Sequence, residues 1–307
     1  MVAKFIDCPE FLADLYTTDM RDIVPDLDLR TGDPTPENLA ELLADCRFLM
    51  NDHTYMNSEL LESCKNLKTI VFMGTGASSY IDLSAAQRIG VRVRTIRGFG
   101  DRSVAEHAIA LMLAAGRKIV AMDRAVRSGQ WQTLDSIEFF GKTLGVVGTG
   151  GIGREMVKLG SALGMKVVAW NRSGISSHLP CKELSLDELF STADVVSLHL
   201  SLTDDTKGLV GAHLLELMNQ NAILINTARA DLVDESALVE ALRAERISHA
   251  ALDVFAEEPL VCTHPLTRLD NVTLTAHAGF MTREASVRLL RMALEVMAEE
   301  MSSADRR

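Results

Sequence analysis

The sequence predicts an α/β protein with two doubly wound, mostly parallel sheets. Short apolar runs alternate with helical patterns along the whole chain, which is typical of stacked βα units. The 307 residues correspond to about two domains of ~150 residues each. A hydrophobic fraction of 47% is ample for packed cores.

The first predicted sheet lies in the first hundred residues. Its strands are expected at 2–7, 27–31, 46–51, 67–74 and 91–96. Helical patterns occur between them at 37–46 and 57–64, and Asn57 and Ser58 form the expected N-cap region of the second helix. A long apolar helix is then expected over 103–126.

A second series of βα units follows this helix. Its strands are expected at 142–148, 166–171, 194–200, 222–228, 249–255 and 271–277, with helices at 154–164, 186–192, 213–218 and 235–245. Six such strands complete a doubly wound sheet, so the amphipathic helix at 282–301 is expected to return to the first domain. The predicted domains are therefore a discontinuous one, 1–98 with 282–307, and an inserted one, 99–281.

The charge balance of the chain disfavours two classes of binding partner. There are 31 Lys+Arg against 42 Asp+Glu, and the resulting net charge of −11 disfavours nucleic acid or an anionic membrane as a partner. The five cysteines form no CxxC pair, and the N-terminus has no basic segment followed by an apolar one. We therefore expect a reduced, cytoplasmic protein. The histidines show no metal-ligand spacing, so no metal is expected.

A glycine-rich motif, G-x-G-x-x-G, follows the first strand of the second series. Its residues are Gly148, Gly150, Gly151, Ile152 and Gly153. Glycines alone could form an ordinary turn, but here they follow a buried strand and open a helix. This context predicts a dinucleotide-binding loop, in which the backbone approaches a pyrophosphate at a helix N-terminus.

The end of the next strand indicates which dinucleotide binds. An NAD site usually has Asp or Glu there, to accept hydrogen bonds from the ribose. This chain has Asn171, Arg172 and Ser173, so no carboxylate repels a 2′-phosphate and a guanidinium is present to pair with it. NADP is therefore favoured, NAD stays possible, and the alternative for Arg172 is a solvated surface arginine.

Three polar residues, Arg229, Glu258 and His277, occur at the ends of the last three predicted strands, the edge where ligands of open α/β sheets bind. Together with six motifs, they make the chain resemble the D-isomer-specific 2-hydroxyacid dehydrogenase family over nearly its whole length. The motifs are VAEH at 104–107, VGTGGIG at 147–153, LHLSLT at 198–203, NTAR at 226–229, LDVFAEEPL at 252–260 and TAHAG at 275–279.

The resemblance assigns roles to the three residues. His277 would exchange the proton in reduction of a 2-oxo acid, because histidine titrates near neutral pH. Glu258 would orient the imidazole, with Glu257 as the nearby competitor, and Arg229 would hold the substrate carboxylate. Each has a structural alternative, such as a satisfied histidine or a solvated charge. His107, which begins an apolar helix, is expected to be structural or interdomain.

The resemblance also implies a set of further contacts. For the cofactor they are Arg154 and Thr206 near the pyrophosphate, Ser201 near the adenine, Asp253 at the nicotinamide carboxamide, and Thr227 and Gly279. For the substrate carboxylate they are Arg229 and the backbone N–H groups of Thr75, Gly76 and Ala77, although this loop could also be a plain glycine turn. In this arrangement a Rossmann cofactor domain is inserted into a flavodoxin-like substrate-binding domain.

The leading functional prediction is an NADPH-dependent reductase of a small 2-oxo acid, such as glyoxylate or hydroxypyruvate, that gives a D-2-hydroxy acid. Phe280 and Met281 make a phosphorylated substrate less expected. One alternative is an NAD-dependent D-2-hydroxyacid or phosphoglycerate-type dehydrogenase. Another, from a different class, is a dinucleotide-sensing scaffold of the corepressor type. The family also implies a homodimer, formed through the helix from Ser103 onward and nearby loops.

Overall fold

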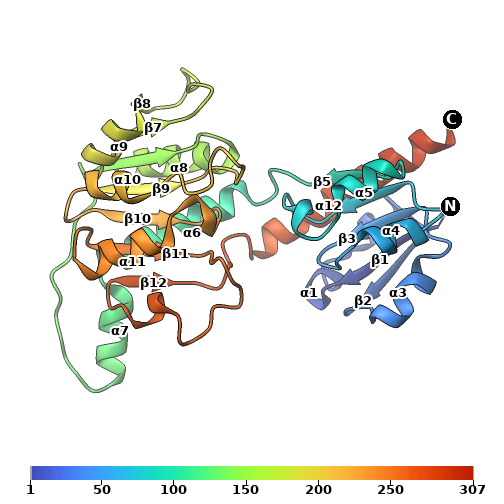
Figure 1. Ribbon diagram of the computed structural model, residues 1–307, viewed down its shortest axis with the longest axis horizontal. Helices are drawn as coiled ribbons and strands as arrows, with labels where there is room; N and C mark the ends of the chain where they lie inside the picture. The colour runs from blue at the N-terminus through green and yellow to red at the C-terminus, as the bar shows by residue number, and fades with distance from the viewer. Residues whose placement is uncertain (1, 307) are drawn as a thin grey trace. The chain divides into compact units, whose positions relative to one another are not determined.

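The computed structural model describes residues 2–306, which fold into two compact units (Figure 1). One unit holds the residues up to Gly100 together with those from Thr282 onward. The other is Asp101–Met281. Each unit has its own parallel sheet with helices on it, so the predicted α/β class with two doubly wound sheets is confirmed.

The first unit contains a five-stranded parallel sheet in the order β2-β1-β3-β4-β5, the flavodoxin-like order. All five strands lie where they were predicted: β1 Ala3–Cys8, β2 Leu27–Thr31, β3 Phe48–Asn51, β4 Thr69–Phe72 and β5 Arg92–Thr95. The helices between them are α1 Glu10–Ala13, α2 Thr18–Arg21, α3 Pro36–Leu43, α4 Ser58–Ser63 and α5 Leu83–Arg88, with the 3₁₀ turn η1 at Ala77–Ser79. The predicted cap of α4 is present, since the Asn57 side chain accepts from the Leu60 N–H at 2.9 Å.

Both faces of this sheet are covered. On one face, Phe5 and Phe48 pack with Leu290 and Leu294 of α12, Arg283–Asp305. The buried carboxylate of Glu300 on the same helix pairs with Arg92 and Arg94 of β5. On the other face, apolar side chains of α3, α4 and α5 form a second cluster with Leu49 and Ile70. The C-terminal helix is thus part of the core of the first unit.

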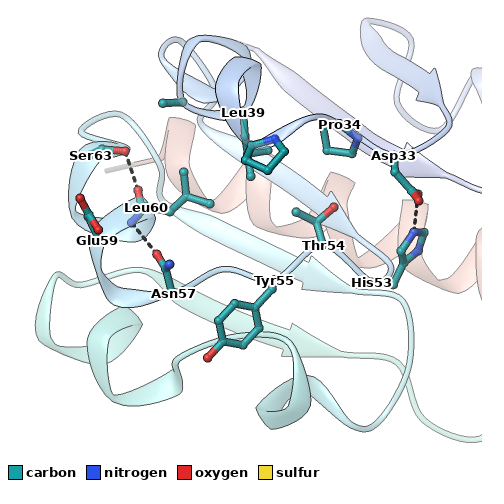
Figure 2. Close-up of a pocket in the computed structure, with 12 residues that line it drawn as sticks. Asp33, Pro34, Leu39, His53, Thr54, Tyr55, Asn57, Glu59, Leu60 and Ser63 are labelled. Atoms are coloured by element: carbon teal, nitrogen blue, oxygen red, sulfur yellow. Dashed lines mark hydrogen bonds and ion pairs between the residues drawn. The ribbon is translucent and has the colours of Figure 1, made fainter. Parts of the chain in front are cut away.

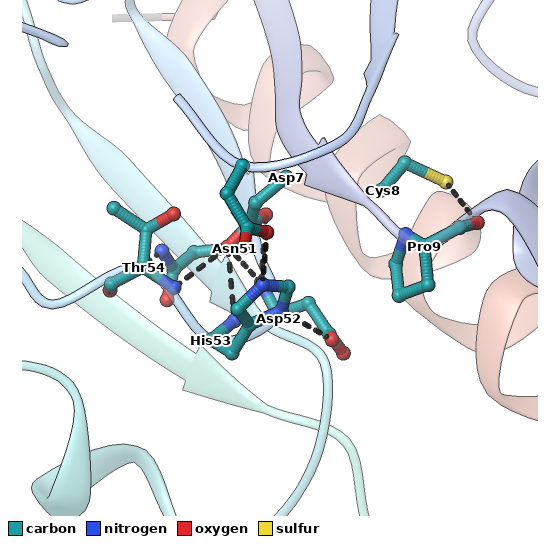
Figure 3. Close-up of polar contacts among 8 residues, drawn as sticks. Asp7, Cys8, Pro9, Asn51, Asp52, His53 and Thr54 are labelled. Carbon is teal, nitrogen blue, oxygen red and sulfur yellow. Dashed lines mark hydrogen bonds and ion pairs between the residues drawn. The ribbon is translucent and has the colours of Figure 1, made fainter. Parts of the chain in front are cut away.

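A buried carboxylate shapes the chain where β3 ends (Figure 3). Asp7 on β1 is fully buried and accepts backbone N–H bonds from Asp52, His53 and Thr54, with shortest distances of 3.0, 2.9 and 2.7 Å. The His53 ring then lies between two carboxylates, 2.9 Å from Asp52 and 2.6 Å from Asp33. These contacts join the loops that follow β2 and β3 at the carboxyl edge of the sheet.

The second unit contains a seven-stranded parallel sheet in the order β12-β11-β10-β9-β6-β7-β8. The prediction of six strands was therefore one short. The missing strand is β8, Lys182–Glu183, whose two charged, exposed residues carry no hydrophobic pattern. The others match their predicted runs: β6 Thr143–Val147, β7 Lys166–Trp170, β9 Val195–Leu198, β10 Ile223–Asn226, β11 His249–Leu252 and β12 Val272–Leu274.

The predicted single helix over 103–126 is wrong, because the chain forms α6 Asp101–Gly116 and α7 Ile119–Arg127. Lys118 between them adopts a left-handed φ of 53°. Gly116 packs so closely on Phe139 that a Cβ would lie 2.2 Å from its ring. The helix ends at this contact. Because the contact joins residues that are distant in the sequence, the hydrophobic periodicity of the helix does not predict it.

The remaining helices of the second unit follow the predicted pattern. They are α8 Gly151–Ala162, α9 Leu186–Thr192, α10 Ala212–Leu217 and α11 Glu235–Arg243, with 3₁₀ turns η2 Ala230–Leu232 and η3 Pro265–Arg268. Within the described residues, no helix is both long and apolar enough to cross a membrane, and this includes the 23-residue α12.

Candidate active site

The glycine loop joins β6 to α8 and has two positions where a residue with a side chain does not fit. Gly148 has a φ of +94°, and a Cβ there would lie 2.7 Å from the carbonyl oxygen of His199. A Cβ on Gly153 would lie 1.9 Å from the carbonyl oxygen of Gly148. These two glycines therefore bring the first turn of α8 close against the end of β6.

The space above this loop is open. A Cβ on Gly150 would meet no atom within 4 Å. The N–H groups of Gly151, Ile152 and Gly153 lie in the first turn of α8 and have no partner within the helix. Exposed Arg154 folds back so that its Nε donates to the Thr149 carbonyl at 3.2 Å. The loop can therefore accept an anion at the helix N-terminus.

Asp101, at the start of α6, lies against the same turn. A Cβ on Gly151 would come within 1.8 Å of its carboxylate, which explains the glycine at this position. Burial raises the pKa of Asp101, and the nearby charge of Glu155 adds to this effect. Asp101 belongs to no motif and lies 50 residues before Gly151, so no sequence pattern indicated that the two are neighbours.

The residues predicted to face the adenosine follow β7 and β9. Asn171 ties the glycine loop to the next turn, since its Oδ1 accepts from the Thr149 N–H at 3.2 Å and its Nδ2 donates to Ser173 Oγ at 2.9 Å. The Arg172 side chain is 76% exposed and lies 3.2 Å from Asp205. No carboxylate occupies position 171, so the strand end is compatible with a 2′-phosphate.

The loop after β9 holds Ser201 and Thr206. The Thr206 hydroxyl accepts from the Thr203 N–H at 2.8 Å and lies 2.8 Å from the Ser201 carbonyl, to which it donates. Thr206 therefore shapes the loop, while the Ser201 side chain is exposed. Beyond β10, the buried Thr227 hydroxyl has no hydrogen-bond partner among the described residues. That orphaned group is the kind of atom that a bound ligand satisfies.

Arg229 is held by its own turn after β10. Buried Asn226 accepts from the Ala228 N–H at 3.0 Å and donates from Nδ2 to the Arg229 carbonyl at 2.9 Å. The guanidinium Nη1 of Arg229 donates to the Ala228 carbonyl at 2.7 Å. The side chain is half-buried, so the rest of its donor fork is available to a carboxylate.

Glu258 and His277 come together although they follow different strands, β11 and β12. His277 Nδ1 lies 2.8 Å from Glu258 Oε2, and Glu258 Oε1 accepts from the Phe255 N–H at 2.9 Å. Among the described residues, none pairs with His277 Nε2, and the ring stands edge-on to Phe280. An imidazole oriented by a carboxylate with its second nitrogen free is suited to proton exchange.

The remaining predicted residues also follow strands, in each unit separately. Arg229, Glu258 and His277 follow the adjacent strands β10, β11 and β12, but no hydrogen bond or ion pair in the described chain joins Arg229 to the other two. Asp253 is buried directly after β11 and accepts from the backbone N–H of Gly279. In the first unit, Thr75, Gly76 and Ala77 follow β4, and their N–H groups donate to none of the described residues.

Much of the chain, including the glycine loop and the three strand ends, matches a known protein family. Residues 109–279, more than half of the chain, match the family model of the NAD-binding domain of D-isomer-specific 2-hydroxyacid dehydrogenases. The chain belongs to this family. Its members are NAD(P)-dependent oxidoreductases that act on the CH–OH group of 2-hydroxy acids, and a nicotinamide cofactor is therefore assigned to this dehydrogenase as well.

Curated relatives of this dehydrogenase carry several substrate names. A glyoxylate reductase of Aeropyrum pernix is 40% identical over 252 residues, which are 78% of this chain and 75% of that protein. A hydroxypyruvate reductase of Thermotoga maritima is 37% identical over 77% of this chain and 78% of its own. A D-3-phosphoglycerate dehydrogenase of Archaeoglobus fulgidus is 38% identical over 85% of this chain but only 50% of its own.

Solved structures of similar proteins contain both nicotinamide cofactors. An acyclic imino acid reductase in complex with NADPH and D-Arg has a TM-score of 0.87 and 27% identity, covering 99% of this chain and 98% of that one. D-lactate dehydrogenase with NAD⁺ from Lactobacillus jensenii has a TM-score of 0.83 and 25% identity, covering 99% and 97%. The glycine loop of this dehydrogenase fits such a cofactor because Gly150 leaves the pyrophosphate position open and Thr227 offers an unsatisfied hydroxyl.

A separate cavity of about 610 Å³ lies between α3 and α4 in the first unit of the dehydrogenase (Figure 2). Its lining combines apolar Leu39, Leu60 and Tyr55 with polar Asp33 and His53. None of the predicted site residues lines it. This cavity is therefore separate from the residues described above.

Proposed function

We propose that the protein reduces a small 2-oxo acid to a D-2-hydroxy acid, with NADPH as the preferred cofactor. The observation that carries the proposal is the pair of His277 and Glu258, 2.8 Å apart at the carboxyl edge of the sheet that also bears the glycine loop. A nicotinamide cofactor, when bound at the glycine loop, would supply a hydride for the carbonyl carbon. The carbonyl oxygen takes a proton, which completes the hydroxy acid.

The chain's own residues handle the proton and the substrate. His277 donates from Nε2 to the developing alkoxide, while Glu258 accepts from Nδ1–H, so the ring keeps one orientation. Arg229 binds the substrate carboxylate through the guanidinium N–H groups that its own turn leaves available. In the reverse direction, His277 accepts the proton of the hydroxy acid.

The NADPH preference rests on the end of β7. The Asn171 side chain accepts from the Thr149 N–H and donates to Ser173 Oγ. Arg172 is exposed and pairs with Asp205 at the surface. A 2′-phosphate would replace or share that exposed ion pair at little cost, because such pairs contribute less than about 1 kcal/mol. The test compares kcat/KM with NADPH and NADH in the wild type and in Arg172→Ala. The substitution should lower the NADPH value about tenfold or more and leave the NADH value nearly unchanged.

The substrate class is tested with a spectrophotometric panel of 2-oxo acids, including glyoxylate, hydroxypyruvate and a phosphorylated 2-oxo acid. We expect the small acids to be turned over fastest, and His277→Gln to reduce turnover at least about 100-fold. Preference for the phosphorylated acid with NADH would favour the phosphoglycerate-type alternative. Absence of turnover with every acid would contradict the reductase and favour the sensing scaffold.

A homodimer and a reducing, cytoplasmic location complete the proposal. Large apolar side chains are exposed around α7 and the segment after it, with Trp131 at 92% and Phe140 at 74%. Exposure of this kind marks an interaction surface, and a second copy of the chain is the proposed partner. Trp131→Glu should shift the sedimentation mass toward a monomer, whereas Tyr55→Glu in the first unit should not.

All five cysteines are free thiols, which supports the proposed reducing, cytoplasmic location.

A further inference from the structure

His107 on α6 contacts the strand end that carries the catalytic histidine. Its Nε2 lies 3.0 Å from Thr275 Oγ1 and 3.3 Å from Asp253 Oδ1. All three side chains belong to the second unit, but 168 residues separate His107 from Thr275 in the sequence. The contact is therefore a product of the fold and has no local cause.

The hydrogen bonds have a defined direction. Thr275 Oγ1 lies 2.5 Å from Asp253 Oδ1, and because the ionised carboxylate has no proton, the threonine must donate. Its oxygen lone pairs are then left to accept from His107, which must carry a proton on Nε2. The chain of donors thus runs from His107 through Thr275 to Asp253.

Asp253 holds the turn that follows β12. Its carboxylate accepts the N–H groups of Ala278 and Gly279, each at 2.9 Å, and its backbone carbonyl accepts the N–H of His277 at 2.8 Å. Burial opposes its ionisation, but hydrogen bonds from His107, Thr275 and the two N–H groups outweigh burial and lower the pKa of Asp253 to about 2. The carboxylate is therefore charged throughout the neutral range.

The backbone of this turn needs such support. His277 adopts a left-handed φ of 52°, which is unusual for a residue with a side chain. A Cβ on Gly279 would lie 3.1 Å from Asp253 Oδ2 and 3.6 Å from His107 Cδ2, so the turn is pressed against both residues. Loss of the network would let the backbone relax and move the ring of His277 relative to Glu258.

We propose that His107 and Thr275 are positioning residues for His277, acting through Asp253 to fix the turn and the ring on it. The proposal rests on the proposed reduction for its catalytic consequence, but the geometry of the turn can be tested without turnover. His107 is thus more than the structural or interdomain residue that its place in an apolar helix predicts. Its ring supplies the first donor of the network.

The test uses three variants of the full chain. Thr275→Val removes the hydroxyl with little change of shape, whereas Thr275→Ser keeps the hydroxyl. His107→Leu removes the first donor of the network. A matched control is Thr273→Val on the same strand, because Thr273 forms an analogous buried bond with His249 at 2.9 Å but does not touch the turn. Thermal melting identifies any variant that fails to fold. If Thr275→Val does not fold, His107→Leu provides the test in its place.

We expect Thr275→Val and His107→Leu to lower kcat about 10- to 100-fold with KM for NADPH little changed, because a misplaced acid weakens chemistry more than binding. The pH–rate profile of reduction should change as well, because the contact between His277 and Glu258 is altered. Thr275→Ser should recover both features and Thr273→Val should keep them. Unchanged kcat and an unchanged profile in Thr275→Val would overturn the proposal.

NMR spectra of the His277 ring separate this inference from the proposed function. If no 2-oxo acid is reduced, the reductase fails, yet the ring signals of His277 must still move in Thr275→Val and return to their wild-type positions in Thr275→Ser. Ring signals that are the same in the wild type, Thr275→Val and His107→Leu would contradict the positioning role even for an active enzyme.

Discussion

His277 Nδ1 lies 2.8 Å from Oε2 of Glu258, and the second oxygen of that carboxylate accepts the Phe255 N–H. Glu258→Gln keeps the shape but removes the charged acceptor that orients the ring. We expect kcat/KM for reduction to fall at least about 100-fold. The neighbouring Glu257→Gln is the control, because Glu257 is exposed and should have almost no effect. Equal losses in both variants would refute the assignment of Glu258.

Asp7 stabilises the first unit through three backbone hydrogen bonds in a fully buried position. Asp7→Asn places an amide group against N–H donors and removes a charge-assisted interaction. The free energy of unfolding of this unit should decrease by about 2–4 kcal/mol. Urea unfolding followed by circular dichroism measures this, with exposed Asp14→Asn as a control that should change stability by less than about 0.5 kcal/mol.

His53 makes the stability of the first unit depend on pH. Burial disfavours its charged form, but hydrogen bonds to Asp52 and Asp33 outweigh burial and raise its pKa above the ordinary 6.5. The charged pair therefore stabilises the fold fully below pH 6.5, and the contribution disappears as pH rises through the higher folded value. Because the His53 ring is 39% exposed and the Asp33 side chain 77%, the effect should stay below about 1 kcal/mol.

His53→Gln removes this contribution. The difference in unfolding free energy between the wild type and the variant should be larger at pH 6 than at pH 8.5, as measured by urea unfolding at both values. Exposed His178→Gln in the second unit is the matched control and should show no such trend. A difference that is constant with pH, or larger at pH 8.5, would exclude the ion-pair explanation.

Local sequence patterns accounted for most of the fold and for the residue types at the site. Buried strands such as Ile223–Asn226 are continuous apolar runs, so their positions could be predicted, whereas the short, charged β8 could not. The polar residues at strand ends were predicted because parallel strands direct ligands to one edge. The contact of His107 with Thr275 was not, because it joins residues distant in sequence through tertiary packing. The same is true of the Phe139 ring that meets Gly116 near the end of α6.

Gly150→Ala tests the cofactor loop with little effect on the fold. Gly150 has a φ of −66°, which alanine adopts readily, and the added Cβ would meet no protein atom within 4 Å. The substitution should therefore leave stability unchanged or raise it by about 0.4–1 kcal/mol, because alanine restricts the unfolded chain.

If the pyrophosphate approaches the backbone at Gly150, the added methyl group of Gly150→Ala occupies its space, and the Kd for NADPH should rise about tenfold or more. Fluorescence titration with NADPH, together with thermal melting, separates the two effects. Unchanged NADPH binding in a folded Gly150→Ala variant would mean that the cofactor takes a different path over α8.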